Sequence, residues 1–327
     1  MLARLKASKT QLVMGKLKIL ATEGLSTPAL EKLRPVADII CFDYGSISWK
    51  NHLATANGLI IRTRTKITDE ILSISPELRW IARAGNGLDN LDLETCISRD
   101  IEVWSTPDAS TESTAEHACL LTLMLARHSD QFVSSLREGR WRKGVELATE
   151  VFGKNLGIVG CGRIGQRVAH RMRAFGMNII GYDPFVHPKE FDDLQIQSVS
   201  LEDLLNQADF ISLHLPLKPD THHFLNEERL KKCKTSAFLI NAARGGLIDE
   251  AALFKLLNEG HFYGVALDVF ESEPPADSYP LIHHPRVLGS PHMGARSQEA
   301  QERIDRRIAE KVLEYISSTK SGRVNEL

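Results

Sequence analysis

The chain has 327 residues, of which 43% are hydrophobic and 25% are charged, and its formal net charge is −2. This composition is typical of a globular protein large enough for two domains, and the balanced charge disfavours nucleic acid or an anionic membrane as a partner. The five cysteines are scattered, without the spacing of a zinc site or a disulfide framework. We therefore expect a reducing compartment, the cytoplasm, and no bound metal.

The first 16 residues are basic and contain no continuous hydrophobic segment. This pattern favours a tail ahead of the first strand over a secretory signal, with a short organellar presequence as the alternative. Elsewhere no apolar run approaches the roughly 20 residues that cross a bilayer. We therefore expect no membrane partner.

Residues 17 to 107 alternate short apolar runs with amphipathic stretches. The runs KILAT, ADIICF, GLIIR, RWIARAG and IEVWS suit strands, while PALEKL, TDEILSI and LDLETCISRD suit helices. This alternation predicts a first α/β unit built on a parallel sheet.

A second α/β unit is predicted after Pro107. It begins with the helical pattern STESTAEHACLLTLMLARH, which Ser110 or Thr111 is placed to cap. The runs NLGIVG, NIIGY, DFISLHLPL, SAFLINAA, GVALDVF and RVLGSPH then follow, separated by stretches of helical length. Short runs that are almost entirely apolar fit strands covered on both faces, so we predict a second doubly wound parallel sheet.

The last segment, SQEAQERIDRRIAEKVLEYISSTKSG, predicts one amphipathic helix with an apolar stripe formed by Ile304, Ile308, Val312 and Ile316. Because it has no sheet of its own, we expect it to return to the first unit. The predicted fold is therefore two Rossmann- or flavodoxin-like α/β domains with a cleft between them. The first, substrate-binding domain takes residues 1–107 plus 301–327, and the nucleotide-binding domain takes residues 108–300.

The run GCGRIG follows the strand LGIV and opens the helix RIGQRVAHRMRAF. In that context Gly160 allows a tight turn, Gly162 lets the backbone approach a pyrophosphate, and Gly165 lets helix and strand pack closely. The N–H groups at the start of the helix would face the phosphates. A Rossmann-like unit without a nucleotide is the alternative.

Asp183 ends the next strand, 18 residues beyond Gly165, where an acid accepts hydrogen bonds from a ribose. Its charge would repel the extra phosphate of NADP, and Pro184 and Phe185 offer no cation to receive it. The predicted cofactor is therefore NAD.

Charged side chains follow several of the later strands, at the edge where doubly wound sheets bind ligands. Arg244 follows FLINAA, Glu271 and Glu273 follow GVALDVF, and His292 follows VLGSP. A guanidinium can bind a substrate carboxylate, an imidazole can transfer a proton near neutral pH, and a carboxylate can hold the imidazole in one tautomer. Together these side chains indicate hydride reduction of a 2-oxo acid. Each also has a structural alternative. Arg244 could form a surface ion pair, Glu273 could lie in a solvated loop, and His292 could be a buried core residue.

The motifs GCGRIG, YDP, NAARGGLIDE, ALDVFESEP and SPHMGA, with RAGNGLDNLDL and STPDASTESTAEH before them, resemble those of the D-isomer-specific 2-hydroxyacid dehydrogenases in order and spacing. The resemblance runs from about Leu17 to the end of the chain. It implies an NAD-dependent oxidoreductase acting on the CH–OH group of a small D-2-hydroxy acid, and a homodimer or tetramer built around the nucleotide-binding domains.

The resemblance also assigns roles. The family's carboxylate-binding arginine falls on Arg244, its acid/base histidine on His292, the partner glutamate on Glu273, and the acid that contacts the nicotinamide amide on Asp268. The other cofactor contacts fall on Gly160, Gly162, Arg163, Ile164, Gly165, Asp183, Leu215, Pro216, Ala242, Ala243, Gly294 and Ala295, with Arg244 and His292 also beside the cofactor.

A substrate loop falls on Asn86 and Gly87, with Arg62 and Arg64 at the neighbouring strand end. The likeness is strongest to the branch that oxidises 3-phosphoglycerate to 3-phosphohydroxypyruvate, which implies a role in serine biosynthesis without the serine-sensing regulatory domain of longer members. Asn86 stands where that branch often has threonine, and Ser110 where many members have asparagine.

A phosphorylated substrate needs further cations, for which the sequence offers Arg62, Arg64 and Lys66, or the run Arg137, Arg140, Arg142 and Lys143. Both groups also suit solvated surfaces. The alternatives are reduction of hydroxypyruvate, glyoxylate or 2-oxo acids in general, formate or phosphite oxidation, and, in a different class, an NAD(H)-sensing, corepressor-like binding protein.

Overall fold

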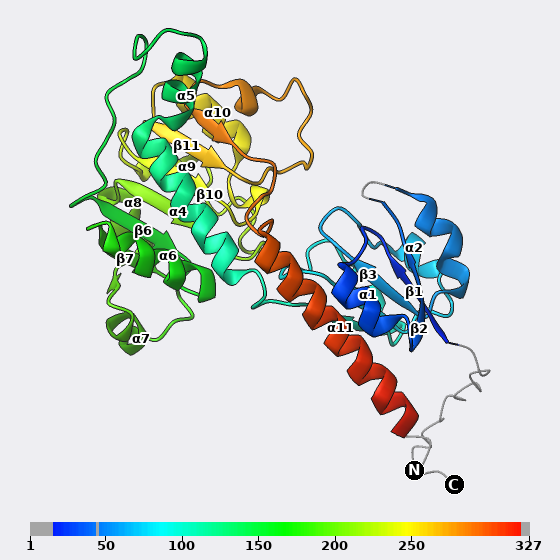
Figure 1. Ribbon diagram of the computed structural model, residues 1–327. Helices are drawn as coiled ribbons and strands as arrows, with labels where there is room; N and C mark the ends of the chain where they lie inside the picture. Colours follow the sequence, from blue (N-terminus) through cyan, green and yellow to red (C-terminus); the bar gives the residue numbers. More distant parts are fainter. Residues whose placement is uncertain (1–15, 44–45, 322–327) are drawn as a thin grey trace. The chain divides into compact units, whose positions relative to one another are not determined.

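The computed structural model describes residues 16–43 and 46–321 (Figure 1). Residues 1–15 of the predicted basic tail and the last six residues of the chain lie outside the described residues. The described residues group into two compact units. Unit 1 contains the chain up to Ala84, Asn90–Ser105 and the chain from Asp305, and unit 2 contains Gly85–Asp89 and Thr106–Ile304.

The sheet of unit 1 has five parallel strands in the described part of the chain, in the order β2-β1-β3-β4-β5. This is the doubly wound order of flavodoxin-like folds. The strands are β1 (Leu17–Ala21), β2 (Ala37–Cys41), β3 (Gly58–Ile61), β4 (Trp80–Arg83) and β5 (Glu102–Trp104). Between them run α1 (Thr27–Leu33), the 3-10 helix η1 (Ser48–Thr55), α2 (Asp69–Ser73) and α3 (Leu93–Ser98).

An aromatic cluster joins β4, β5 and α11 in unit 1. Trp80 is completely buried, stacks on Trp104 at 4.8 Å between ring centroids, and meets the edge of Tyr315 at 6.1 Å. Gly58 is paired with Trp80 across the sheet, and a Cβ at Gly58 would lie 2.0 Å from the indole ring. The glycine therefore makes room for the tryptophan.

The sheet of unit 2 has seven parallel strands among the described residues, in the order β12-β11-β10-β9-β6-β7-β8. The order reverses at β6, as in dinucleotide-binding folds. The strands are β6 (Asn155–Val159), β7 (Asn178–Tyr182), β8 (Gln197–Ser198), β9 (Phe210–Leu213), β10 (Phe238–Asn241), β11 (Gly264–Leu267) and β12 (Val287–Gly289).

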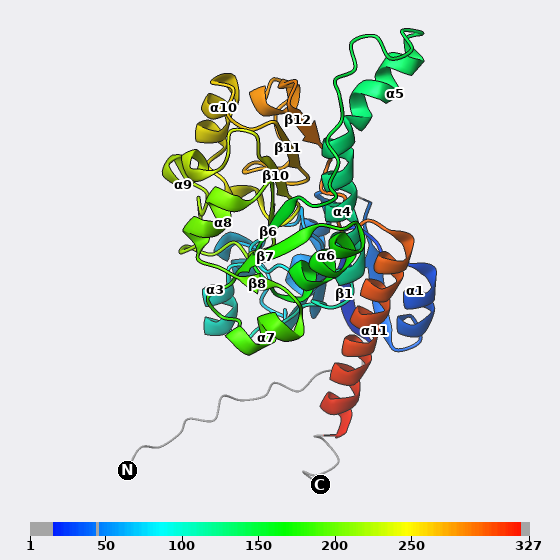
Figure 2. The ribbon, with the colours of Figure 1, turned by 90° about the vertical axis from the view of Figure 1, so that its left-hand side faces the viewer.

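Helices cover both faces of this sheet (Figure 2). They are α4 (Thr111–Arg127), α5 (Ser129–Arg137), α6 (Arg163–Ala174), α7 (Pro188–Asp193), α8 (Leu201–Gln207), α9 (Glu227–Lys232) and α10 (Glu250–Asn258), with the 3-10 helices η2 (Gly245–Leu247) and η3 (Pro280–His283). Asp249 caps α10 by accepting a hydrogen bond from the N–H of Ala252. Ser110 occupies the predicted cap position of α4, but its side chain makes no capping bond.

The last helix, α11 (Gln298–Ser321), begins in unit 2 and continues in unit 1 from Asp305. The predicted apolar stripe is buried, with Ile308 and Val312 completely inaccessible. Asp305 is also buried and accepts a hydrogen bond from the N–H of Ser26 at 2.7 Å. The helix is thus attached to unit 1 by both apolar and polar contacts.

Two parallel, doubly wound sheets confirm the predicted fold class. The two-residue strand β8 was not predicted, because it is too short to show a period. Gly85–Asp89 groups with unit 2, where Gly87 and Asp89 contact Arg244. Within residues 16–43 and 46–321, none of the helices has the length and apolar character that crossing a membrane requires.

Candidate active site

The glycine loop joins β6 to α6, and two of its three glycines, Gly160 and Gly165, are required by steric contacts. Gly160 has a φ of +95°, and a Cβ there would lie 2.8 Å from the backbone carbon and oxygen of His214. A Cβ at Gly165 would lie 2.1 Å from the carbonyl oxygen of Gly160, so only glycine allows α6 to pack this closely. At Gly162, by contrast, nothing lies within 4 Å of the Cβ position.

Gly162 therefore leaves the backbone open where α6 begins, and Arg163 and Ile164 contribute N–H groups of the first turn, which have no intrahelical partners. A helix start of this kind binds phosphate groups. The tight turn, the close helix and the open N-terminus together fit a dinucleotide.

Asp183 lies directly beside this loop, at the end of β7. Its carboxylate accepts hydrogen bonds from the N–H groups of Cys161 and Phe185, both at 2.9 Å. These bonds fix the carboxylate at the position where an adenosine ribose is bound in this fold. Burial raises the pKa of the Cys161 thiol to about 12, so Cys161 has no role as a nucleophile.

The other predicted cofactor contacts lie in segments that follow the strands of the same sheet. They are Leu215 and Pro216 after β9, Ala242 and Ala243 after β10, and Gly294 and Ala295 after β12. The guanidinium of Arg163 pairs with Asp108 at 3.0 Å. Parallel strands end at one edge, so these segments lie along the edge that also carries the glycine loop.

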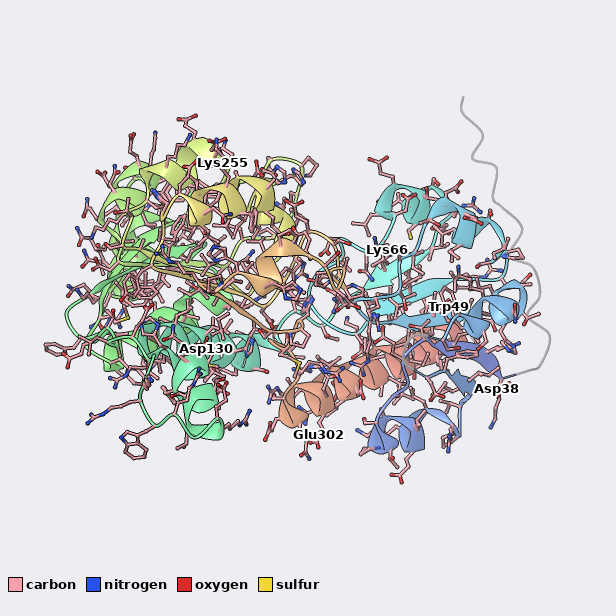
Figure 3. All side chains as sticks on the ribbon, turned by 90° about the horizontal axis from the view of Figure 1, so that it is seen from above. Asp38, Trp49, Lys66, Asp130, Lys255 and Glu302 are labelled. Carbon is pink, nitrogen blue, oxygen red and sulfur yellow. The ribbon has the colours of Figure 1, made fainter. Side chains whose placement is uncertain are left out.

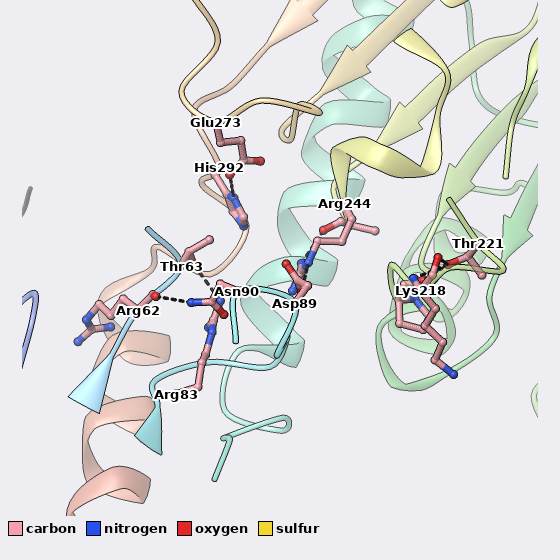
Figure 4. A network of polar contacts seen from close by, with 12 residues as sticks. Arg62, Thr63, Arg83, Asp89, Asn90, Lys218, Thr221, Arg244, Glu273 and His292 are labelled. Carbon is pink, nitrogen blue, oxygen red and sulfur yellow. Dashed lines mark hydrogen bonds and ion pairs between the residues drawn. The ribbon is translucent and has the colours of Figure 1, made fainter. Parts of the chain in front are cut away.

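Arg244 is held by the turn after β10. The buried Asn241 accepts from the N–H of Ala243 at 3.1 Å and donates to the carbonyl of Arg244 at 2.8 Å. The Arg244 Nε donates to Asp89 at 2.9 Å (Figure 4). A Cβ at Gly87 would lie 1.7 Å from Nη2 of Arg244, so the predicted substrate loop and the arginine lie against each other. The ion pair with Asp89 was not predicted.

Glu273 and His292 form a direct pair, with the carboxylate Oε2 2.6 Å from the imidazole Nδ1 (Figure 4). The other carboxylate oxygen of Glu273 accepts from the N–H of Phe270 at 3.2 Å. His292 has a left-handed backbone with φ +54°. A carboxylate that accepts from Nδ1–H leaves Nε2 as the nitrogen for proton transfer and stabilises the imidazolium. Glu271 instead pairs with His223 at 2.8 Å.

Asp268 organises the turn that carries His292. It is 1% exposed, its carboxylate accepts from the hydroxyl of Ser290 and the N–H groups of Met293 and Gly294, and its carbonyl accepts from the N–H of His292 at 2.8 Å. Burial acts to raise the pKa of Asp268, but these hydrogen bonds and His117 outweigh it and lower the pKa.

His117, on α4, lies 3.1 Å from the carboxylate of Asp268. His117 was not predicted, because a histidine on an amphipathic helix gives no signal of what it faces. Among residues 16–43 and 46–321, no three His, Cys, Asp or Glu side chains gather to hold a metal ion.

In unit 1, the predicted substrate residue Arg62 is already engaged. Its guanidinium lies 2.7 Å from the buried carboxylate of Asp305, and its carbonyl accepts from Asn90 at 3.0 Å (Figure 4). A second arginine, Arg83, is 6% exposed and donates to the hydroxyl of Thr63 at 2.9 Å. Arg83 was not singled out from the sequence, because it lies within the apolar run of β4.

Comparison with known proteins supports the same kind of site. Residues 119–294 match the family model of the D-isomer specific 2-hydroxyacid dehydrogenases, NAD binding domain. The chain is 40% identical over 297 residues to the D-3-phosphoglycerate dehydrogenase of Methanocaldococcus jannaschii, a match that covers 90% of this chain and 56% of that relative. The chain thus spans little more than half the length of that relative.

Two solved structures of similar length also match. One is the D-lactate dehydrogenase of Aquifex aeolicus complexed with NAD and lactic acid, at 30% identity and a TM-score of 0.84, covering 92% of this chain and 96% of that one. The other is a glyoxylate reductase from Paecilomyes thermophila, at 30% identity and a TM-score of 0.83, covering 93% and 96%.

Proposed function

Because this chain belongs to the D-isomer specific 2-hydroxyacid dehydrogenase family, we propose that it transfers a hydride between NAD(H) and carbon 2 of a D-2-hydroxy acid. The observation that carries the proposal is the pair of Glu273 and His292, which is joined at 2.6 Å in the unit that also holds the glycine loop. NAD, when bound, supplies the carbon that accepts or donates the hydride.

Three side chains of unit 2 have distinct roles in this proposal. Arg244 uses Nε for Asp89 and Nη1 for the carbonyl of Ala243, and we assign Nη2, beside Gly87, to the substrate carboxylate. In the reductive direction Nε2 of His292 donates a proton to the carbonyl oxygen as carbon 2 receives the hydride. Glu273 keeps the proton of the imidazole on Nδ1 and stabilises its positive charge.

The substrate we propose is 3-phosphoglycerate, with 3-phosphohydroxypyruvate as its oxidised form. The support is the 40% identity to a D-3-phosphoglycerate dehydrogenase, together with exposed basic residues on unit 1. Arg64 and Lys66 are exposed there, and we take Lys66 (Figure 3) as the phosphate contact to test. Such a substrate would place the protein in serine biosynthesis.

The second candidate substrate is an unphosphorylated 2-oxo acid. The likeness to a glyoxylate reductase and a D-lactate dehydrogenase favours it. The two candidates share the reacting atoms and the roles of Arg244 and His292. They differ only in the need for a phosphate contact.

The test is oxidation of NADH by the purified protein with phosphohydroxypyruvate, hydroxypyruvate, glyoxylate, pyruvate and 2-oxoglutarate, repeated with NADPH. We expect the highest kcat/KM for phosphohydroxypyruvate and a preference for NADH. Lys66→Ala should raise KM for phosphohydroxypyruvate about tenfold, equivalent to about 1.4 kcal/mol, and leave KM for hydroxypyruvate unchanged. Equal rates with both compounds would favour the unphosphorylated class, and no turnover with any would refute the enzymatic proposal.

Unit 2 binds the nucleotide in this proposal, because it holds the glycine loop at the start of α6. Unit 2 also carries a projecting arm around α5 (Figure 2), with exposed apolar side chains at Leu136, Trp141 and Leu147, whose exposed fractions are 63%, 72% and 92%. Large exposed apolar side chains on one segment of the chain suit an association surface, which supports a homodimer. Light scattering on the wild type and Trp141→Asp tests this point.

A reducing compartment such as the cytoplasm completes the proposal. All five cysteines are free, and four of them are buried. Such cysteines are usual in proteins that fold under reducing conditions. Fractionation of cells that produce the full chain tests this assignment.

A further inference from the structure

Glu250 is a buried carboxylate in the first turn of α10, and none of the roles described above uses it. Its exposed fraction is 2%. One carboxylate oxygen accepts a hydrogen bond from the N–H of Glu271 at 3.0 Å, and the other accepts from the hydroxyl of Tyr279. Burial raises the pKa of Glu250. Burying a carboxylate is costly unless its oxygens are hydrogen-bonded, so these two bonds hold it in place.

The bond between Glu250 and Glu271 is reciprocal. The N–H of Glu250 donates to the side chain of Glu271 at 3.2 Å, and His223 lies 2.8 Å from the same carboxylate oxygen. The start of α10 is therefore joined to the segment after β11 by two hydrogen bonds that run in opposite directions.

A second contact joins the same two segments. A Cβ at Gly245 would lie 1.9 Å from the carbonyl carbon of Phe270 and 2.4 Å from the backbone nitrogen of Glu271, so the two backbones are packed directly against each other. Gly245 follows Arg244, and Glu271 stands two residues before Glu273. The contacts therefore lie between the two residues whose relative position matters for the proposed reaction.

We propose that Glu250 is a positioning residue, which fixes the 270–273 segment against the 244–246 turn and so sets Glu273, with His292, at the correct place relative to Arg244. The inference rests on the proposed function. Glu250 touches none of the reacting groups, and it acts through the backbone of Glu271. A displacement of about 1 Å in a catalytic group can lower a rate by about 100-fold. Loss of the hydrogen bond between Glu250 and Glu271 is therefore expected to lower kcat.

The competing explanation is that the negative charge of Glu250 only stabilises the N-terminus of α10. Two substitutions separate the effect of side-chain length from the effect of the negative charge. Glu250→Gln keeps the length of the side chain and an oxygen that accepts from the N–H of Glu271, but it removes the charge. Glu250→Asp keeps the charge at the helix start, but it withdraws the acceptor by one methylene.

The first measurement is steady-state kinetics with the full chain and the substrate identified by the panel above. We expect Glu250→Asp to lower kcat about 10- to 100-fold. Glu250→Gln should stay within about threefold of the wild type, and NADH affinity should be unchanged in both variants. If charge is what matters, the order of the two variants reverses.

The matched control is Glu227, which is also the first residue of a helix, α9, but lies at the surface. Its carboxylate pairs with Lys231 at 2.6 Å and with Lys255, which Figure 3 labels, at 2.9 Å. Glu227→Asp and Glu227→Gln make the same chemical changes at a carboxylate whose partners are these two lysines. Both should leave kcat unchanged.

A second measurement does not depend on turnover. In protein labelled with 15N-histidine, long-range 1H–15N correlation at alkaline pH shows which ring nitrogen of His292 carries the proton, and the signals are assigned by their loss in His292→Asn. The wild type and Glu250→Gln should show the Nδ1–H tautomer that Glu273 holds. Glu250→Asp should show a mixture of tautomers.

The outcomes are distinct. If Glu250→Asp keeps both the wild-type kcat and the Nδ1–H tautomer, the positioning role is wrong. If Glu250→Gln loses as much activity as Glu250→Asp, the length of the side chain does not explain the effect of Glu250 on kcat, and the proposal is overturned. If the wild type turns over no 2-oxo acid, the proposed function fails, and the tautomer measurement still decides whether Glu250 holds Glu273 in place.

Discussion

Replacing the glycines of the β6–α6 loop by alanine should separate stability from nucleotide binding. At Gly165 the new Cβ would lie 2.1 Å from the carbonyl oxygen of Gly160 and 3.0 Å from Ile158, whereas ordinary contact begins at 3.4 Å. The oxygen belongs to the backbone and cannot rotate away, so α6 must move by more than 1 Å. At Gly162 the same methyl group enters open space, at a φ of −72° that alanine adopts freely.

The expected magnitudes follow from these distances. Overpacking costs about 1–3 kcal/mol; because the obstacle is a backbone oxygen, we expect the upper part of this range at Gly165, about 2–3 kcal/mol, of which the better helix propensity of alanine offsets about 1 kcal/mol. A net loss of about 1–2 kcal/mol lowers the melting temperature of a unit of this size by about 2–8 °C. Gly162→Ala, at the N-cap, should cost no more than about 1 kcal/mol in stability. Its methyl group occupies the space through which the pyrophosphate approaches, so NADH affinity should fall at least about tenfold, or about 1.4 kcal/mol.

The assay is differential scanning calorimetry combined with NADH titration followed by nucleotide fluorescence. Calorimetry is preferred to tryptophan fluorescence, because Trp49, Trp80 and Trp104 lie in unit 1, and the fourth tryptophan, Trp141 of unit 2, is 72% exposed and reports little on the core. A Gly165→Ala variant that melts like the wild type would refute the steric argument. A Gly162→Ala variant that binds NADH normally would refute the assignment of the phosphate site.

Three further predictions concern single residues of unit 2. Asp183→Asn keeps an acceptor for the N–H of Cys161 but removes the negative charge. The preference for NADH over NADPH, measured as the ratio of kcat/KM values, should therefore fall about tenfold. An unchanged ratio would show that charge repulsion by Asp183 does not cause the preference. His292→Asn, chosen because asparagine tolerates the φ of +54°, should lower kcat about 10²- to 10⁴-fold with NADH affinity retained, and near-normal turnover would contradict the acid/base role. Burial lowers the pKa of His214 to about 4, so the unfolded chain takes up a proton first and stability should fall as the pH drops from about 6.5 towards 4. Calorimetry across this range should show a shallower decline for His214→Gln, which keeps a partner for Ser212; equal slopes would assign the pH dependence to other groups.

Local sequence patterns were sufficient to predict most of the strands and helices of the fold. Apolar runs such as GLIIR and SAFLINAA became buried parallel strands, and the stripe from Ile304 to Ile316 became the buried face of α11. These signals are readable because burial on both faces of a sheet leaves a continuous apolar run, and burial of one helix face leaves a period of 3.6. The glycine loop was readable for a similar reason, since its steric demands fall within a few residues.

The sequence by itself therefore determined the two doubly wound sheets, the nucleotide loop, and the candidate residues after each strand. Only the tertiary structure decided how those residues are held: Arg244 by Asp89, 155 positions away, Asp268 by His117, and the Glu273 segment by Glu250. Strand order brings such partners together across long stretches of chain, and a charged residue in a loop looks the same in the sequence whether it faces solvent or another charge. The pairing of side chains depends on which strands are neighbours, and no local pattern records that.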